Sequence, residues 1–219
     1  MHNNLIQHNN EAQFLRLYKI IQEREKYMSN EAKIIQYSAA IRYFVKFLQG
    51  KEDYSQNIRV ILFWIYAKLG DIYYEEALQS QDNSKYFLVI EYYNQSLAFA
   101  HNIEEKNRIL FMLKEIYYYL GDEDALVRIE ETWAENHKKE DKYSAYMLLA
   151  KKAETPRIKI LFLEKALIEV TSQEESFYTK YQDTLNICSQ LTVLYDLLGD
   201  KEQAERIKKL REKTLKLLN

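Results

Sequence analysis

The sequence contains little glycine, proline or cysteine. Its 219 residues include four glycines, one proline and one cysteine. So few turn-forming residues argue against a turn-rich all-β fold and against a flexible linker between domains. The single cysteine, Cys188, excludes an internal disulfide and a cysteine-based metal cluster, and its apolar-periodic surroundings indicate a small buried side chain rather than a reactive thiol. We therefore expect helix almost throughout.

The sequence also lacks an excess of one charge and any long apolar run. Its 31 Lys and Arg against 33 Asp and Glu give a net charge of −2, so electrostatics offers no argument for a polyanionic partner. The longest apolar run, Val60 to Ala67, is far shorter than the roughly 20 residues that span a bilayer. The first ten residues lack the basic and apolar regions of a secretory signal. We expect a cytoplasmic protein without a membrane span.

Helix start and stop signals are, by contrast, frequent. After a tail over residues 1–9 that we expect to be disordered, the apolar periodicity predicts ten amphipathic helices with short connections. Short connections make successive helices antiparallel neighbours. The resulting five hairpins form one domain over residues 10–219. The hairpins cover about residues 10–50, 55–101, 102–137, 142–171 and 172–219.

Particular residues mark the predicted helix ends. Ser, Thr, Asn or Asp side chains at the first position can accept hydrogen bonds from free backbone N–H groups, and Glu three residues later completes a capping box. Glycine just past the end can adopt the left-handed conformation. The predicted N-caps are Ser29, Thr155 (before Pro156), Asp122 and Asp200; the capping boxes are Asn102 with Glu105 and Ser172 with Glu175; the closing glycines are Gly50, Gly121 and Gly199.

One short fragment, Leu-Gly-Asp, occurs three times. It lies at Leu69–Asp71, Leu120–Asp122 and Leu198–Asp200. At the second and third sites the glycine ends one helix and the aspartate begins the next. Gly70 instead falls inside a predicted helix, where glycine costs about 1 kcal/mol relative to alanine. We therefore expect a close helix approach at Gly70, and Asp71 facing a groove.

The surroundings of these fragments resemble the tetratricopeptide repeat. The pattern Tyr66-x-x-Leu69-Gly70-x-x-Tyr73, followed by Val89-x-x-x-Tyr93-x-x-Ser96, is similar to the two helices of that repeat. Leu113-x-x-x-Tyr117-x-x-Leu120-Gly121 and Leu191-x-x-x-Tyr195-x-x-Leu198-Gly199 are similar to further copies. The resemblance covers roughly residues 55–219. It implies an all-α, right-handed α-α superhelix, a solenoid in which neighbouring hairpins share one core.

No pattern in the chain indicates an enzyme or a cofactor. The four histidines, His2, His8, His101 and His137, are scattered without metal-ligand spacing, so we expect no metal site. The sequence contains no glycine-rich phosphate loop and no nucleophile motif. We predict no catalytic residues and no cofactor.

The resemblance also implies a partner site. In the family, the first helix of each hairpin lines a concave groove, and such linings of aromatic and polar residues suit peptides. The positions carried over are Trp64, Ala67, Asp71, Tyr74, Glu75, Arg108, Phe111, Glu115, Tyr118, Tyr119, Asn186, Ser189, Val193 and Asp196. Acidic residues such as Asp71 and Glu115 stand where a clamp for a C-terminal carboxylate would need donors. The alternative is that this face is solvated or covered by the protein's own helices.

We therefore predict a non-enzymatic adaptor or scaffold that binds a peptide or protein, with an apolar or mildly basic segment in its groove. Two alternatives stay open: a peptide-sensing regulator similar to bacterial pheromone receptors but without a DNA-binding domain, and a self-assembling subunit that forms a homodimer through its end helices. Nucleic acid is not expected, because the groove residues are net acidic. The basic helix from Lys201 to Asn219 is read as a polar cap, with an anionic surface as its alternative partner.

Overall fold

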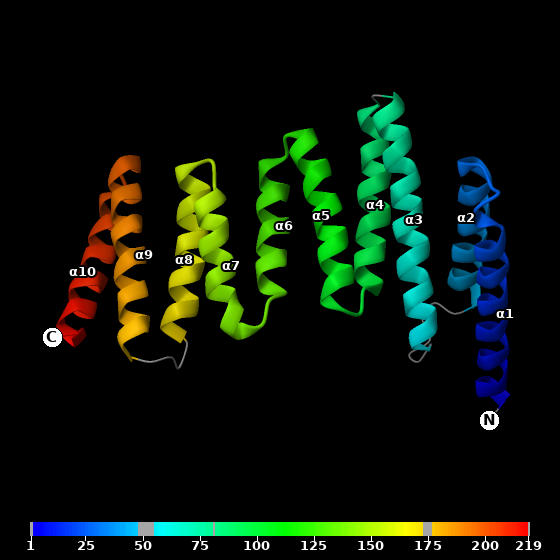
Figure 1. The fold of residues 1–219 in the computed structure, drawn as a ribbon, viewed down its shortest axis with the longest axis horizontal. Helices are drawn as coiled ribbons and strands as arrows, with labels where there is room; N and C mark the ends of the chain where they lie inside the picture. The colour runs from blue at the N-terminus through cyan, green and yellow to red at the C-terminus, as the bar shows by residue number, and fades with distance from the viewer. Residues whose placement is uncertain (1, 48–54, 81, 173–176, 219) are drawn as a thin grey trace. The chain divides into compact units, whose positions relative to one another are not determined.

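A computed structural model describes residues 2–47, 55–80, 82–172 and 177–218. These ranges form ten helices and contain no strand, which confirms the all-α prediction. The chain divides into two compact units, Met1–Glu123 and Asp124–Asn219, which we name the N-terminal and C-terminal units (Figure 1). The right-handed superhelix and the single array over residues 10–219 remain predictions.

The helix boundaries follow the predicted start and stop signals closely. The helices are α1 (His2–Glu25), α2 (Asn30–Phe47), α3 (Gln56–Ser80), α4 (Asn83–Phe99), α5 (Ile103–Leu120), α6 (Glu123–Glu135), α7 (Lys139–Lys152), α8 (Pro156–Ser172), α9 (Phe177–Leu198) and α10 (Lys201–Leu218).

The largest differences from the predicted boundaries lie at the first helix and before the ninth. We expected a disordered tail at the N-terminus, but helix α1 begins at His2. No glycine or proline separates this stretch from the apolar turns that follow, so a helix that forms in those turns propagates toward the N-terminus. Ser172 is not an N-cap: it lies at the end of α8, where its hydroxyl donates to the Glu169 carbonyl at 2.8 Å. Its expected partner Glu175, and the closing Gly50, lie outside the described residues.

Most other predicted caps are present. The Thr155 hydroxyl accepts from the Ile158 N–H at 3.3 Å, and the Asp200 carboxylate accepts from the Gln203 N–H at 3.1 Å. Asn102 accepts from the Glu105 N–H at 2.8 Å. The Glu105 side chain, however, accepts from the His101 N–H at 3.0 Å, one residue before the position that a capping box requires. The caps therefore fix where these helices begin.

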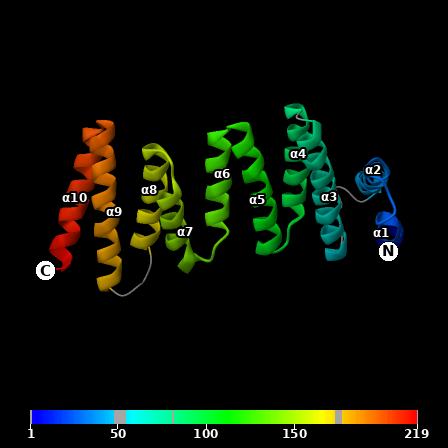
Figure 2. The same ribbon diagram turned by 45° about the horizontal axis from the view of Figure 1, so that its top comes forward.

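The N-terminal unit is built around the antiparallel pair α3 and α4, which lie side by side in Figures 1 and 2. Aromatic rings fill the interface between them. Tyr73 stacks on Tyr92 with centroids 5.3 Å apart, and Tyr66 stacks on Phe99 at 5.7 Å. The buried core shared with α1 and α2 consists of Phe14, Tyr18, Ile21, Tyr37, Ala40, Phe44, Ile58, Ile61, Leu62, Ile65, Tyr66, Leu69 and Ile72.

Two small residues allow α3 and α4 to approach closely. A Cβ atom at Gly70 would lie 2.5 Å from a ring carbon of Tyr93, which confirms the packing role predicted for this glycine. Ser96 is fully buried and its hydroxyl donates to the Phe63 carbonyl at 2.9 Å. Gly121 and Gly199 have φ of 69° and 75° and end α5 and α9. The three Leu-Gly-Asp fragments thus have two structural roles, as predicted.

The C-terminal unit has its own core, formed where α7, α8, α9 and α10 pack against one another, together with Ala134 of α6. Ala166 and Cys188 are fully buried there. Burial raises the pKa of the Cys188 thiol above its usual value, which keeps it protonated and unreactive. The remaining large buried members are Tyr146, Leu149, Ile160, Phe162, Leu163, Leu167, Val170, Ile187, Leu191, Tyr195 and Ile207.

Candidate functional site

Three of the predicted groove residues meet between α3 and α5. The Arg108 guanidinium donates to the Asp71 carboxylate at 3.2 Å and lies 5.0 Å from the centroid of the Trp64 ring. Asp71 also accepts from the buried Tyr93 hydroxyl at 2.8 Å. Burial and the Asp71 charge raise the pKa of Tyr93 well above its usual value, so the hydroxyl stays protonated as a donor. Asp71 therefore holds Arg108 in place and is occupied by the protein's own donors.

A second group of predicted residues meets one end of α4. The buried Tyr86 ring lies between two of them, with its centroid 6.1 Å from Tyr74 and 4.9 Å from Tyr119. Such tilted and edge-on arrangements are the favourable geometry for aromatic pairs. Tyr74 is consequently part of the packing, whereas Tyr119 remains 57% exposed.

The outer face of α5 carries exposed aromatic residues. Phe111 is 61% exposed and Tyr118 is 69% exposed, and residues at this spacing share one face of a helix with Glu115 between them. Glu115 makes no ion pair with any residue that the structure describes. We call Phe111, Glu115, Tyr118 and Tyr119, with Trp64 and Arg108 beside them, the α5 surface. Because Asp71 neutralises the charge of Arg108, the unpaired charge of the α5 surface is the Glu115 carboxylate.

The other predicted residues lie elsewhere. Glu75, on α3, accepts a long hydrogen bond of 3.5 Å from Asn30 at the start of α2, so it does not join the α5 surface. In the C-terminal unit, Asp196 pairs with Lys208 of α10 at 3.3 Å. Ser189 borders a hollow between α9 and α10, and exposed Asn186 accepts from Gln190 at 3.3 Å. Asp196 and Ser189 therefore lie in the α9–α10 region, and Asn186 bonds within α9.

The arrangement at Asp71 recurs in the chain. In each case a carboxylate on one helix accepts from a tyrosine on the next helix and pairs with a cation on the helix after that, an arrangement that we call a Tyr–carboxylate–cation link. Besides Tyr93–Asp71–Arg108, the links are Tyr195–Glu164–Arg206, with distances of 2.7 and 2.9 Å, and Tyr37–Glu25–Lys68. Each link fastens three consecutive helices together.

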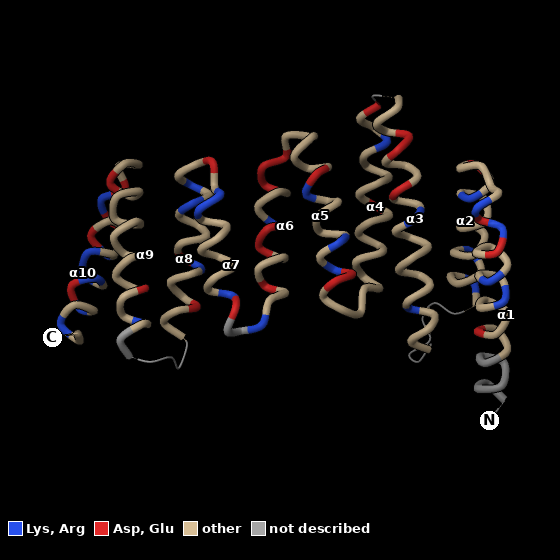
Figure 3. The backbone as a smooth tube through the Cα atoms, in the orientation of Figure 1, with Lys and Arg blue, Asp and Glu red and all other residues tan. Residues whose placement is uncertain are grey.

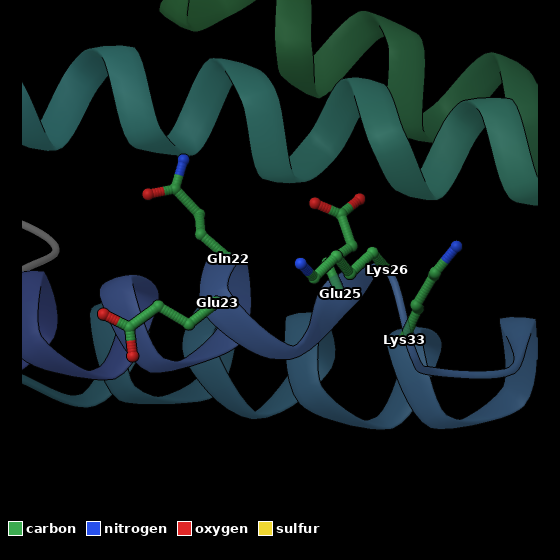
Figure 4. A pocket seen from close by; sticks show the side chains of 5 residues that line it. All are labelled: Gln22, Glu23, Glu25, Lys26 and Lys33. Carbon is green, nitrogen blue, oxygen red and sulfur yellow. The ribbon is translucent and has the colours of Figure 1, made fainter.

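A cavity of about 530 Å³ lies beside one of these links. It is bordered by residues from α1, from the turn that follows it and from α2, and Figure 4 shows Gln22 and Glu25 pointing from α1 toward the neighbouring helix. Burial alone would raise the pKa of Glu25, but hydrogen bonds from Lys68 and Tyr37 and nearby positive charges leave it below the usual value. Since Glu25 is already satisfied by these partners, the cavity is a polar hollow next to a structural link.

Sequence reasoning missed Tyr86 and Tyr93 as parts of this region. Both lie on the second helix of the hairpin, whereas the resemblance places groove residues on the first helix only. The signal available for Tyr93 was its pairing with Gly70: a glycine in a helix interior implies a large neighbouring side chain. No comparable signal marks Tyr86.

Within the ranges given above, every helix is too short or too polar to span a bilayer. The same residues do not bring three or more His, Cys, Asp or Glu side chains together as ligands for a metal ion. A comparison with protein-family models finds none that matches this chain, and a comparison with curated proteins finds no match either. Function is therefore argued from the α5 surface.

Proposed function

We propose that this protein is a non-enzymatic adaptor, similar to tetratricopeptide repeat proteins, whose α5 surface binds an apolar, mildly basic peptide segment of a protein partner. The observation that carries the proposal is the exposure of Phe111, Tyr118 and Tyr119 along one helix. Aromatic residues supply contact area at small entropic cost and are enriched where proteins bind one another.

Charge defines the class of partner. Lys and Arg side chains bind both to carboxylates and to aromatic faces, and cation–π contacts contribute about 0.5–1 kcal/mol at exposed sites. Glu115 lies between Phe111 and Tyr118, so a basic side chain that reaches it also passes these rings. Arg108 is already paired with Asp71 and does not repel such a segment strongly.

The supporting contacts favour a preorganised surface. Trp64, Asp71 and Tyr93 hold Arg108 from α3 and α4, and Tyr86 supports Tyr119. A surface that is ordered before binding loses less conformational entropy when its partner arrives.

The test is a fluorescence-anisotropy titration of the full chain with two short labelled peptides. One alternates Leu and Phe with Lys, and the other has Glu at each Lys position. We expect the basic peptide to bind, and its affinity to fall at least about tenfold, which corresponds to about 1.4 kcal/mol, in Glu115→Lys, because a like charge then replaces the carboxylate that attracts its lysines. Binding of neither peptide, together with concentration-dependent self-association in analytical ultracentrifugation, would favour the self-assembling alternative and contradict the proposal.

A further inference from the structure

The C-terminal unit contains a groove of different character from the α5 surface. Helices α7, α8 and α9 border an open hollow of about 540 Å³. We call it the α7–α9 groove. Its apolar lining comes mainly from α7 and α8, and Gln190 contributes from α9. The lining includes Met147, Leu148, Lys151, Lys159, Leu163 and Gln190.

The charged residues of this lining are both lysines. Neither Lys151 nor Lys159 forms an ion pair with any residue that the structure describes. Lys165, farther along α8, differs in that it pairs with Glu131 and Glu135 at 3.3 and 3.6 Å. The end of α7 and the start of α8 are rich in basic residues (Figure 3), and Lys152 and Arg157 add exposed positive charge there. The groove therefore presents positive charge that the described residues leave unbalanced.

Apolar side chains accompany this charge. Leu148 is 42% exposed at the groove. On α9, Val193 and Leu197 are 67% and 69% exposed, and they follow Gln190 by three and seven residues, so they share its side of the helix. Exposed apolar side chains beside unpaired cations are typical of a surface that binds another molecule.

We propose that the α7–α9 groove is a second binding surface, which takes an acidic peptide segment containing apolar side chains. Carboxylates of that segment pair with Lys151 and Lys159, and its apolar side chains pack on Met147 and Leu148, whose side chains remain accessible. A nucleic acid shares the negative charge, but single strands bind by stacking their bases on several aromatic rings. The lining is mainly aliphatic, with Tyr143 as its aromatic member, so a peptide fits it better.

The experiment titrates the full chain with the acidic peptide of alternating Glu and apolar residues described above, and compares Lys151→Glu/Lys159→Glu with wild type. We expect the affinity for this peptide to fall at least about tenfold, because each reversed charge replaces an attraction by a repulsion. The matched control is Lys213→Glu/Lys216→Glu on α10. It changes the net charge equally, and we expect an affinity within about twofold of wild type.

Unchanged affinity in the groove variant, or an equal loss in the α10 control, would overturn the inference. Tighter binding of a single-stranded RNA oligonucleotide than of the acidic peptide would overturn it as well. Both lysines of the groove have solvent-accessible side chains, and an unchanged circular dichroism spectrum verifies that the variant folds.

The same titrations separate this inference from the proposed function. The basic peptide reports on the α5 surface, so Lys151→Glu/Lys159→Glu leaves its affinity unchanged. Failure of the basic peptide to bind would contradict the proposed function alone, whereas failure of the acidic peptide would contradict the second surface alone.

Discussion

At the scale of single residues, Gly70 shows how one missing methyl group determines a helix contact. Its backbone lies against the ring of Tyr93, whose hydroxyl in turn donates to Asp71. Asp71 then positions Arg108 beside Trp64. The close approach of α3 and α4 thus helps to position Arg108 at the edge of the α5 surface.

We expect Gly70→Ala to destabilise the protein, although the same change in an open helix stabilises it by about 1 kcal/mol. The new Cβ would lie 2.5 and 2.6 Å from two ring carbons of Tyr93. Relieving such overpacking requires shifts that cost about 2 kcal/mol. Urea unfolding measures the effect. In a double-mutant cycle, Gly70→Ala should cost much less in a Tyr93→Ala background, and an equal cost in both backgrounds would contradict the contact.

Glu25 provides a prediction on pH dependence. Its pKa is lowered in the folded state, because hydrogen bonds from Lys68 and Tyr37 outweigh the effect of burial. A carboxyl group with a lowered pKa contributes stability that is complete above its unfolded pKa, about 4.3, and is lost as the pH falls through its folded pKa. We expect Glu25→Gln to lower the free energy of unfolding by about 1 kcal/mol at neutral pH.

The measurement is urea unfolding of wild type and Glu25→Gln at neutral pH and at a pH below the folded pKa. The difference between the two proteins should shrink at the lower pH. Glu23→Gln, which changes an exposed carboxylate on the same helix, serves as the control with a small effect at both pH values. If the difference in free energy of unfolding between wild type and Glu25→Gln did not depend on pH, this would contradict a stabilising role for the charge of Glu25.

At the scale of helices, N-caps decide where elements begin. Thr155 caps α8, whereas Ser172 lies at the other end of the same helix and bonds to the carbonyl of Glu169. We expect Thr155→Ala to reduce the free energy of unfolding by about 1 kcal/mol and Ser172→Ala to change it by less than about 0.5 kcal/mol. Urea unfolding of the two variants checks this, and equal losses would argue against the assignment of the ends of α8.

These helix ends also show what the sequence can and cannot predict. Thr155, Asn102 and Asp200 act on backbone groups within one turn, so a local pattern was sufficient to predict them. Ser172 matched the same local pattern, but α8 extends to it, because apolar packing of residues such as Val170 stabilises the last turn of the helix. A local N-cap pattern therefore fails to predict the helix end where tertiary packing stabilises a further helical turn.

Long-range partners were less predictable. The sequence placed Trp64, Asp71 and Arg108 in one region, and the structure brings them together. It did not predict that Tyr93 occupies Asp71, because a hydrogen bond between residues 22 positions apart depends on the rotation of two helices. For the same reason, the sequence did not predict that the carboxylate of Asp196, which was assigned to the groove, pairs with Lys208.

At the scale of the whole molecule, the chain contains two units whose surfaces differ in charge. The α5 surface of the N-terminal unit has aromatic side chains with a free carboxylate, and the α7–α9 groove of the C-terminal unit has aliphatic side chains with two free lysines. A protein that carries two such surfaces can distinguish binding partners by the sign of their charge, because like charges across an interface oppose binding.

A matched pair of double variants tests whether the exposed aromatic side chains of α5 bind a partner segment. Phe111→Ala/Tyr118→Ala removes one phenylalanine and one tyrosine from the α5 surface. Phe87→Ala/Tyr27→Ala removes the same residue types from other positions, where the side chains are 67% and 79% exposed. Neither variant opens the core, so both should fold, as thermal unfolding can verify.

The measurement is the affinity of each variant for the basic peptide, by fluorescence anisotropy. We expect a loss of at least about tenfold for Phe111→Ala/Tyr118→Ala, since two aromatic contacts contribute about 1.4 kcal/mol or more together. For Phe87→Ala/Tyr27→Ala we expect an affinity within about twofold of wild type. Equal affinities for the two variants would contradict the claim that the α5 surface is the binding site.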